Sequence, residues 1–230
     1  MTLNRAADAD PTDSGEGFTA VEIERFVIFA GDGGDVINID DLNGLGITDL
    51  DILLDGRSDG GSSADADPLD LDPSDDGDAD RVIFDIESTN DDTFTITTPT
   101  TDTVEIDHSG FVATLLGASW TLDGDGSNDD TLEIKAGLGA DVIDATGVDK
   151  RQIQLQLRGE AGDDIVRGSD FEDVIDGGLD DDILTGGPGL DQFFDEGGTD
   201  TLEEVTALAD DRAIDVLLTD NAYITGDSLE

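Results

Sequence analysis

Residues 159–203 read GEAGDDIVR, GSDFEDVID, GGLDDDILT, GGPGLDQFF and DEGGTDTLE, which are five consecutive units of nine residues. The sixth position is always aspartate: Asp164, Asp173, Asp182, Asp191 and Asp200. The eighth position is always apolar: Val166, Ile175, Leu184, Phe193 and Leu202. Glycine fills the first position in four units and the fourth position in three. Columns that hold in every unit indicate a structural repeat rather than an effect of composition.

The nine-residue spacing predicts that the chain winds in regular turns, called coils below. Each unit consists of a short loop that ends in aspartate and a strand of about three residues. If two units make one turn, units 18 residues apart stack, and their strands pair in parallel at roughly 4.7–4.9 Å. Asp164, Asp182 and Asp200 then lie along one side of the stack, and Asp173 and Asp191 lie along the other. The apolar eighth position points inward and fills a thin core.

The same pattern continues upstream with longer spacing. AGLGADVID (136–144) and AGDGGDVIN (30–38) place Asp141 and Asp35 at the sixth position, and weaker copies surround Asp80 and Asp130. The 23 residues from Asp141 to Asp164 predict one wider coil, with residues 145–152 as its outer loop. The short alternating segments between these copies predict strands at 104–107, 111–116, 132–135 and 153–157.

Stacked loops of this composition predict calcium sites. Carboxylates and backbone carbonyls are oxygen ligands, which Ca²⁺ accepts at roughly 2.3–2.6 Å. The aspartates predicted to bind several Ca²⁺ ions are Asp35, Asp141, Asp164, Asp173, Asp182, Asp191 and Asp200. The glycines predicted to line these sites are Gly159, Gly162, Gly168, Gly177, Gly178, Gly186, Gly187 and Gly189. The alternative is that the aspartates only cap turns, but uncompensated carboxylates about 5 Å apart would repel one another strongly.

The amino-acid composition excludes some classes of function. The chain has 59 acidic and 10 basic residues, and its net charge of −49 excludes nucleic-acid binding, which needs Lys and Arg. No apolar run approaches the roughly 18 residues of a membrane helix, so membrane insertion is not expected. Aspartate outnumbers glutamate 47 to 12, as expected for carboxylates held close to the main chain in turns. A halophilic acidic surface is another explanation of the charge, and both can hold.

Catalytic motifs are weak, and we expect no enzyme. GRSDG (56–60) resembles a nucleophile elbow, with Ser58 and His108 in hydrolase order, but the residues after it cannot form the required helix. His108 is the only histidine, which excludes histidine-cluster metal sites, and its position predicts a turn residue. The segment 123–134 begins like an EF-hand, but it has Asn128 and Ile134 where glycine and glutamate are needed.

The sequence divides into four predicted segments: lead-in strands at 1–29, wide coils at 30–158, the nonapeptide array at 159–203, and further strands at 204–230. An Asp-rich insertion at 56–80 interrupts the wide coils, and it predicts either a solvated loop or an additional calcium loop. A solenoid needs polar caps, and the segment at 204–230 offers none at its end, so we expect a fragment of a longer protein.

The nonapeptide array is similar to the RTX (hemolysin-type calcium-binding) family. The stretches 33–56 and 139–169 also resemble segments of large bacterial RTX surface proteins. The resemblance implies an all-β fold, a right-handed parallel β-solenoid (β-roll or β-helix) with calcium in its turns. It also implies type I secretion and an extracellular or cell-surface location. Phe171 and Asp180 replace glycine at the fourth position, which puts the metal sites beside them in doubt.

The expected function is a calcium-binding structural or spacer segment that folds on binding calcium. Its expected partners are calcium, neighbouring repeats of the same protein and, through open strand edges, further copies end to end. Two other functions stay open. One is an adhesin-type module that recognises a glycan or a surface, and the other is the accessory repeat domain of a secreted enzyme.

Overall fold

The structure is a computed structural model, and it describes residues 25–30, 34–40, 47–54, 79–101, 103–118, 130–194 and 196–203, together with two short strands near the C-terminus. Every regular element among these residues is a strand, so the all-β prediction is confirmed. The described part contains no helix long and apolar enough to cross a membrane. The GRSDG motif, the EF-hand-like stretch as far as 129 and the insertion as far as 78 lie outside the described residues.

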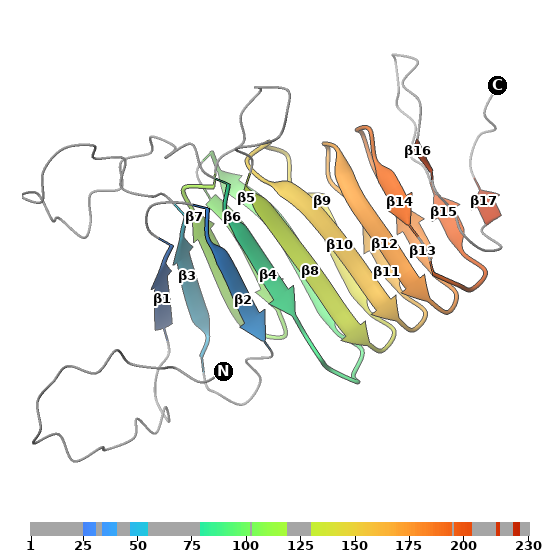
Figure 1. Ribbon diagram of the computed structural model, residues 1–230, viewed down its shortest axis with the longest axis horizontal. Coiled ribbons are helices and arrows are strands. Elements are labelled where there is room, and N and C mark those ends of the chain that lie inside the picture. Colours follow the sequence, from blue (N-terminus) through green and yellow to red (C-terminus); the bar gives the residue numbers. More distant parts are fainter. Residues whose placement is uncertain are drawn as a thin grey trace, which may run out of the picture.

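The strands form two sheets (Figure 1). Sheet A contains, in spatial order, β1 (Arg25–Phe29), β3 (Asp49–Leu53), β7 (Phe111–Leu116), β6 (Thr103–His108), β5 (Thr93–Thr100), β9 (Val142–Gly147), β11 (Ile165–Arg167), β13 (Ile183–Thr185), β15 (Thr201–Glu203) and β17 (Tyr223–Thr225). Sheet B contains β16 (Asp215–Val216), β14 (Gln192–Phe194), β12 (Asp173–Leu179), β10 (Gln154–Ala161), β8 (Thr131–Leu138), β4 (Arg81–Asp85) and β2 (Val36–Asp40).

From β8 onward the described strands alternate between the two sheets, and each pairs in parallel with the next strand of its own sheet. Ile165 pairs with Ile183 and Ile175 with Phe193, so the shift is 18 residues within the nonapeptide array. Val142 pairs with Ile165, a shift of 23 residues. The predicted stacking of nonapeptide units and the 23-residue step before them are therefore both found. The predicted outer loop at 145–152 is partly wrong, because β9 continues to Gly147 and Ala145 is buried in the core.

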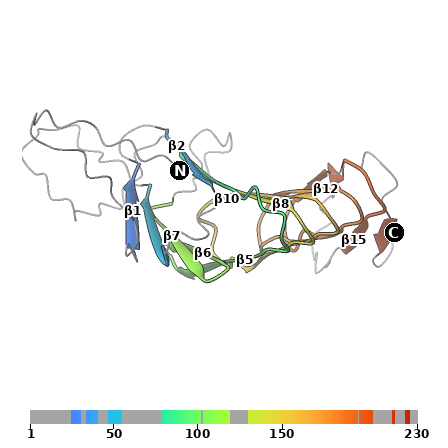
Figure 2. The same ribbon diagram turned by 90° about the horizontal axis from the view of Figure 1, so that it is seen from below.

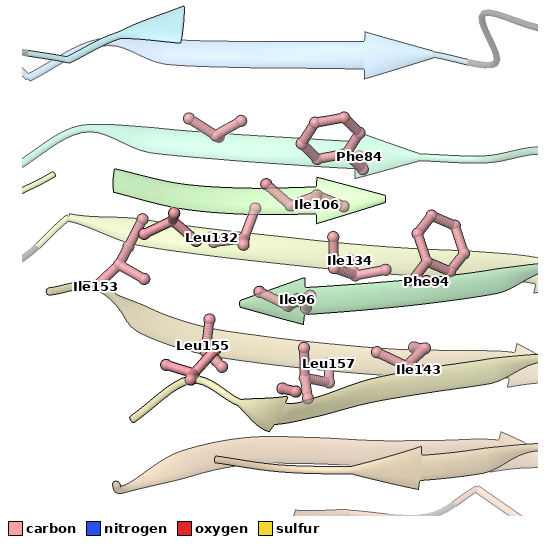
Figure 3. Packing of buried hydrophobic residues seen from close by; sticks show 14 of the residues in the cluster. Phe84, Phe94, Ile96, Ile106, Leu132, Ile134, Ile143, Ile153, Leu155 and Leu157 are labelled. Atoms are coloured by element: carbon pink, nitrogen blue, oxygen red, sulfur yellow. The ribbon is translucent and has the colours of Figure 1, made fainter. Parts of the chain in front are cut away.

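The core lies between the two sheets, which Figure 2 shows as two layers. The eighth-position residues are its inner row, because successive strand residues point to opposite faces. Val166, Ile175 and Phe193 are 0% exposed, as the repeat predicts. The wide coils extend the same row with Ile134 and Phe84, and Figure 3 shows how side chains of this cluster lie between the sheets. Burying each such side chain stabilises the fold by about 1.5–3 kcal/mol.

The fold is not parallel throughout, and here the sequence-based expectation was wrong. β6 pairs antiparallel with both β5 and β7. The connection from β6 to β7 is only Ser109–Gly110, and these residues have φ values of 51° and 89°. A two-residue turn with two positive φ values joins neighbouring antiparallel strands, whereas a parallel pair needs a crossover of a dozen or more residues. These short connections therefore impose an antiparallel meander on this part of sheet A.

Candidate metal centre

A row of aspartates lies where the strands of sheet A begin. In this Asp164 ladder (Asp92, Asp141, Asp164, Asp182 and Asp200), each main-chain N–H donates to Oδ1 of the next aspartate. The N···O distances are 2.7 Å from Asp92 to Asp141, 2.7 Å from Asp141 to Asp164, 2.8 Å from Asp164 to Asp182 and 2.9 Å from Asp182 to Asp200. All five residues are at least 95% buried. Consecutive loops thus bring together the carboxylates that the repeat predicts on one side.

Two shorter ladders lie where the strands of sheet B begin. Asp173 N–H donates to Asp191 Oδ1 at 3.0 Å, as the repeat predicts. In the wide coils, Asp35 N–H donates to Asp80 Oδ1 at 2.7 Å and Asp80 N–H to Asp130 Oδ1 at 2.8 Å. These two rows are not continuous, because sheet register places Asp173 level with Leu132 rather than with Asp130.

The first-position glycines pack against the carboxylate of their own unit. A Cβ added at Gly168 would lie 2.6 Å from Asp173 Oδ2. An added Cβ would be at least as close to Oδ2 of the aspartate in three other units, in the pairs Gly159 with Asp164, Gly177 with Asp182 and Gly186 with Asp191. A side chain at this position would therefore fill the space beside the carboxylate oxygen.

The second-position and fourth-position glycines lie against main-chain carbonyls of the adjacent coil. A Cβ at Gly162 would lie 2.5 Å from the carbonyl carbon of Gly139, and φ at Gly162 is 132°. Gly178, Gly187 and Gly189 meet carbonyl oxygens of Glu160, Ser169 and Phe171 in the same way, also at positive φ. The loops therefore stack with carbonyl oxygens turned toward the next loop.

The two replacements of the fourth-position glycine keep this arrangement. Asp180 adopts a φ of 80°, a conformation that aspartate tolerates better than most residues. The carbonyl oxygens of Phe171 and Asp180 lie against Gly189 and Gly198, the place that the Gly139 carbonyl takes against Gly162. The loops at the two replacements therefore present the same backbone oxygens as the glycine-containing loops.

The donor set fits a calcium ion. Oδ2 of Asp92, Asp141, Asp164 and Asp200 is buried and has no hydrogen-bond partner. Leaving such an oxygen unsatisfied costs about 1–3 kcal/mol, and more when it is charged. In the described part of the chain no three His, Asp or Glu side chains converge as a cluster. A bound cation would therefore take one carboxylate from each loop and its other oxygens from main-chain carbonyls, a mixture that Ca²⁺ accepts.

Without a cation, burial disfavours the ionised form of Asp141, Asp164 and Asp173. Burial raises the pKa of Asp164 from 3.8 to about 7, and the charges of Asp141 and Asp163 add to the rise. Burial likewise raises the pKa of Asp173 to about 7 and that of Asp141 to about 6. A divalent cation between the loops would remove this penalty by neutralising both carboxylates.

We expect the calcium-free chain to gain strand structure on acidification. The pKa values of Asp141, Asp164 and Asp173 are higher in the fold than in the unfolded chain, so between about pH 4 and pH 7 the fold binds more protons. Its stability is therefore greatest below that window and is lost as the pH rises through about 7. Far-UV circular dichroism in EGTA should show more strand at pH 5 than at pH 7.5.

The control for this pH effect is Asp164→Asn, which has no proton to bind and should show a smaller change over the same range. Calcium should act in the opposite direction, because protons compete with it for the same oxygens, so the calcium midpoint should rise at pH 5. An unchanged or lower strand content of the wild type at pH 5 would contradict the assigned burial of these carboxylates.

Asp92 belongs to the Asp164 ladder but was not predicted from the sequence. The segment 87–95 carries Asp92 at the sixth position and Phe94 at the eighth, and Phe94 pairs with Ile143 of the eighth-position row. Glu87 and Asn90 stand where glycine is usual, which hid the copy. The Asp–x–apolar spacing alone could have found it.

His108 lies at a strand-to-turn boundary, as the sequence predicts, but it belongs to the strand and not to the turn. His108 is the last residue of β6, is 4% exposed, and stacks on Phe94 with ring centroids 4.3 Å apart. Its Nε2 lies 3.2 Å from Asp92 Oδ1. The antiparallel register that pairs Phe94 with His108 brings the two rings together.

A family model of the RTX calcium-binding nonapeptide repeat, in four copies, matches residues 158–193. Residues 158–193 are RTX calcium-binding repeats. The RTX segment contains Asp164, Asp173, Asp182 and Asp191, and repeats of this kind bind calcium. Asp92 and Asp141 of the same ladder lie before it. No curated protein and no solved structure matched the chain.

Proposed function

We propose that this chain is a calcium-binding structural segment of a secreted protein. In this proposal the two sheets are the faces of a right-handed parallel β-solenoid, a β-roll in the RTX repeats, with calcium ions in the turns. The observation that carries the proposal is the row of buried carboxylate oxygens without hydrogen-bond partners, including that of Asp164 within the RTX repeats. Right-handed crossovers between parallel strands are the rule, which supports the handedness.

Ions of the Asp164 ladder would be held by sixth-position carboxylates and by carbonyl oxygens of the intervening loops. Asp173 and Asp191 would hold ions on the opposite side in the same way. Bound Ca²⁺ would supply positive charge between coils, and each ion would neutralise two carboxylates of a chain that carries a net charge of −49. Because self-repulsion opposes a compact state, binding and folding would be coupled.

Cross-strand ion pairs on the outer face of sheet B support a structural role. Glu133 of β8 is 2% exposed and pairs with Arg81 of β4 and Arg158 of β10. Arg158 Nη1 also lies 3.6 Å from Asp176 Oδ2 on β12. These scarce basic side chains therefore bind neighbouring coils of the same chain together, which favours a spacer over a catalytic role.

An extracellular location is proposed because proteins with RTX repeats are typically secreted. Extracellular calcium modules bind at about 10⁻⁴–10⁻³ M, a range in which calcium would be bound outside the cell but not in the cytosol. Type I secretion and a cell-surface location rest on the RTX resemblance. An adhesin role would need a recognised glycan or surface, which the described residues do not identify.

Calcium binding by the full chain tests the proposal. Isothermal titration calorimetry at pH 7.5 should show several Ca²⁺ ions bound, with half-saturation at about 10⁻⁴–10⁻³ M. Mg²⁺ should bind more weakly, since it demands near-octahedral geometry at about 2.0–2.1 Å. Absence of calcium binding at 10⁻² M, or equal binding of both ions, would overturn the proposed function.

A further inference from the structure

The Asp164 ladder ends at Asp92, and its end is built differently from the rest. Within the ladder, Oδ1 of each aspartate accepts the N–H of the aspartate one coil earlier. Asp92 has no such neighbour, because the next strand of sheet A, β6, runs antiparallel to β5. β6 therefore finishes at this point of the fold instead of beginning there, and its last residue is His108.

His108 supplies the missing donor. Its Nε2 lies 3.2 Å from Asp92 Oδ1, and both side chains are about 95% buried. A carboxylate only accepts hydrogen bonds, so Nε2 of His108 carries the proton in this contact. The imidazole is fixed by stacking on Phe94 at an interplanar angle of 7°. His108 thus takes the place of a main-chain N–H of an additional coil.

The loop before β5 also stacks on the next loop as a repeat loop does. A Cβ at Gly139 would overlap the carbonyl oxygen of Asn90 and would lie 2.8 Å from its carbonyl carbon. This is the contact that Gly162 makes with Gly139 one coil later. Ala140 N–H donates to Asp91 Oδ1 at 3.0 Å and fixes the two loops further. Residues 86–92 therefore act as a repeat loop without its glycines.

Two oxygens at this position lack hydrogen-bond partners. Oδ2 of Asp92 and Oδ2 of Asp141 are both buried without one, although their Oδ1 atoms are satisfied by His108 and by Asp92 N–H. Two buried carboxylates on adjacent loops repel each other unless a cation lies between them. Both residues lie before the matched RTX repeats.

We propose that Asp92 and Asp141 hold one further Ca²⁺ between residues 86–92 and 139–141, and that His108 positions Asp92 for it. The inference rests on the proposed function, because this site would bind Ca²⁺, the same kind of ion that is proposed for the RTX repeats. Asp92 and Asp141 are the side-chain ligands, and main-chain carbonyls of the two loops supply the rest. His108 is a positioning residue that acts through Asp92 Oδ1 and leaves Oδ2 to the cation.

The test counts Ca²⁺ ions bound to the full chain by equilibrium dialysis with elemental analysis in saturating calcium. Asp92→Asn keeps the size and the Oδ1 acceptor of the side chain but removes the charge, and it should bind one ion fewer than the wild type. His108→Leu should also lose one ion. His108→Gln should restore the full count, because its amide N–H can occupy the place of Nε2–H. Asp107→Asn, which removes an exposed charge from the same strand, should bind as many ions as the wild type.

The outcomes separate the two proposals. A wild type that binds no calcium overturns the proposed function and this site with it. If the wild type binds calcium and the Asp92→Asn variant binds the same number of Ca²⁺ ions, only this site is overturned. An unchanged count in His108→Leu overturns the positioning role. If His108→Leu fails to fold by circular dichroism, His108→Gln decides that role, since the loss of one ion there would contradict it.

Discussion

Replacing Asp182 by asparagine is expected to raise the calcium concentration at the folding midpoint by about 10–100-fold, which corresponds to about 1.4–2.8 kcal/mol. Asp182 is 1% exposed and lies in the middle of the Asp164 ladder. Its Oδ1 accepts the N–H of Asp164, and its own N–H donates to Asp200. It can therefore serve ions on both sides. Asparagine keeps the Oδ1 acceptor, so the change isolates the loss of negative charge.

The measurement is a calcium titration followed by far-UV circular dichroism at pH 7.5. Asp107→Asn is the matched control, because Asp107 is exposed on β6 and lies outside the ladder. Its midpoint should stay within about twofold of the wild type, as for a surface substitution. Equal midpoints for Asp182→Asn and Asp107→Asn would contradict the assignment of Asp182 to the metal sites.

Replacing Gly162 by alanine is expected to destabilise the calcium-bound fold by more than about 4 kcal/mol, or to prevent folding of the stacked coils. The added Cβ would overlap the backbone carbonyl of Gly139, and φ at Gly162 is 132°, which an L-residue rarely adopts. Neither backbone can move away, because Gly139 N–H donates to the carbonyl of Ala161 at 3.0 Å. Relief would require separating two coils that the aspartate ladder holds together.

Gly110→Ala is the matched control. Gly110 also has a positive φ, 89°, but nothing lies within 4 Å of the added Cβ. Its cost should therefore be about 1–2 kcal/mol, the conformational term alone. Thermal denaturation in saturating calcium compares the two variants. Similar melting temperatures would show that the close stacking of loops at Gly162 is not a feature of the folded chain.

The strict nine-residue period made the RTX coils predictable. Every unit has Asp at its sixth position and an apolar residue at its eighth. The period of nine residues therefore predicts which aspartates lie on each side of the stack and which side chains form the inner row. Leu184 and Leu202 pair with each other as the period requires. The 23-residue step from Asp141 to Asp164 was also enough to identify one wider coil.

The wide coils could not be derived in the same way. Asp130 lies four residues before Ile134 of the inner row, whereas Asp173 lies two residues before Ile175. Two extra residues before the inner row shift Asp130 out of line with Asp173, and no sequence signal marks that shift. The turn at Ser109–Gly110 was visible in the sequence, but short alternating strands do not reveal whether a neighbour is parallel or antiparallel. The contact of His108 with Asp92 follows only from that pairing.

The most direct test of the central claim is the strand content of the full chain with and without calcium at pH 7.5 and low ionic strength. Far-UV circular dichroism in EGTA should lack the strand signal, because a net charge of −49 opposes compaction of a thin core. Millimolar Ca²⁺ should restore the signal, and Na⁺ at equal ionic strength should not. Full strand content in EGTA at low salt, or recovery by Na⁺ alone, would contradict the claim that calcium binding folds this chain.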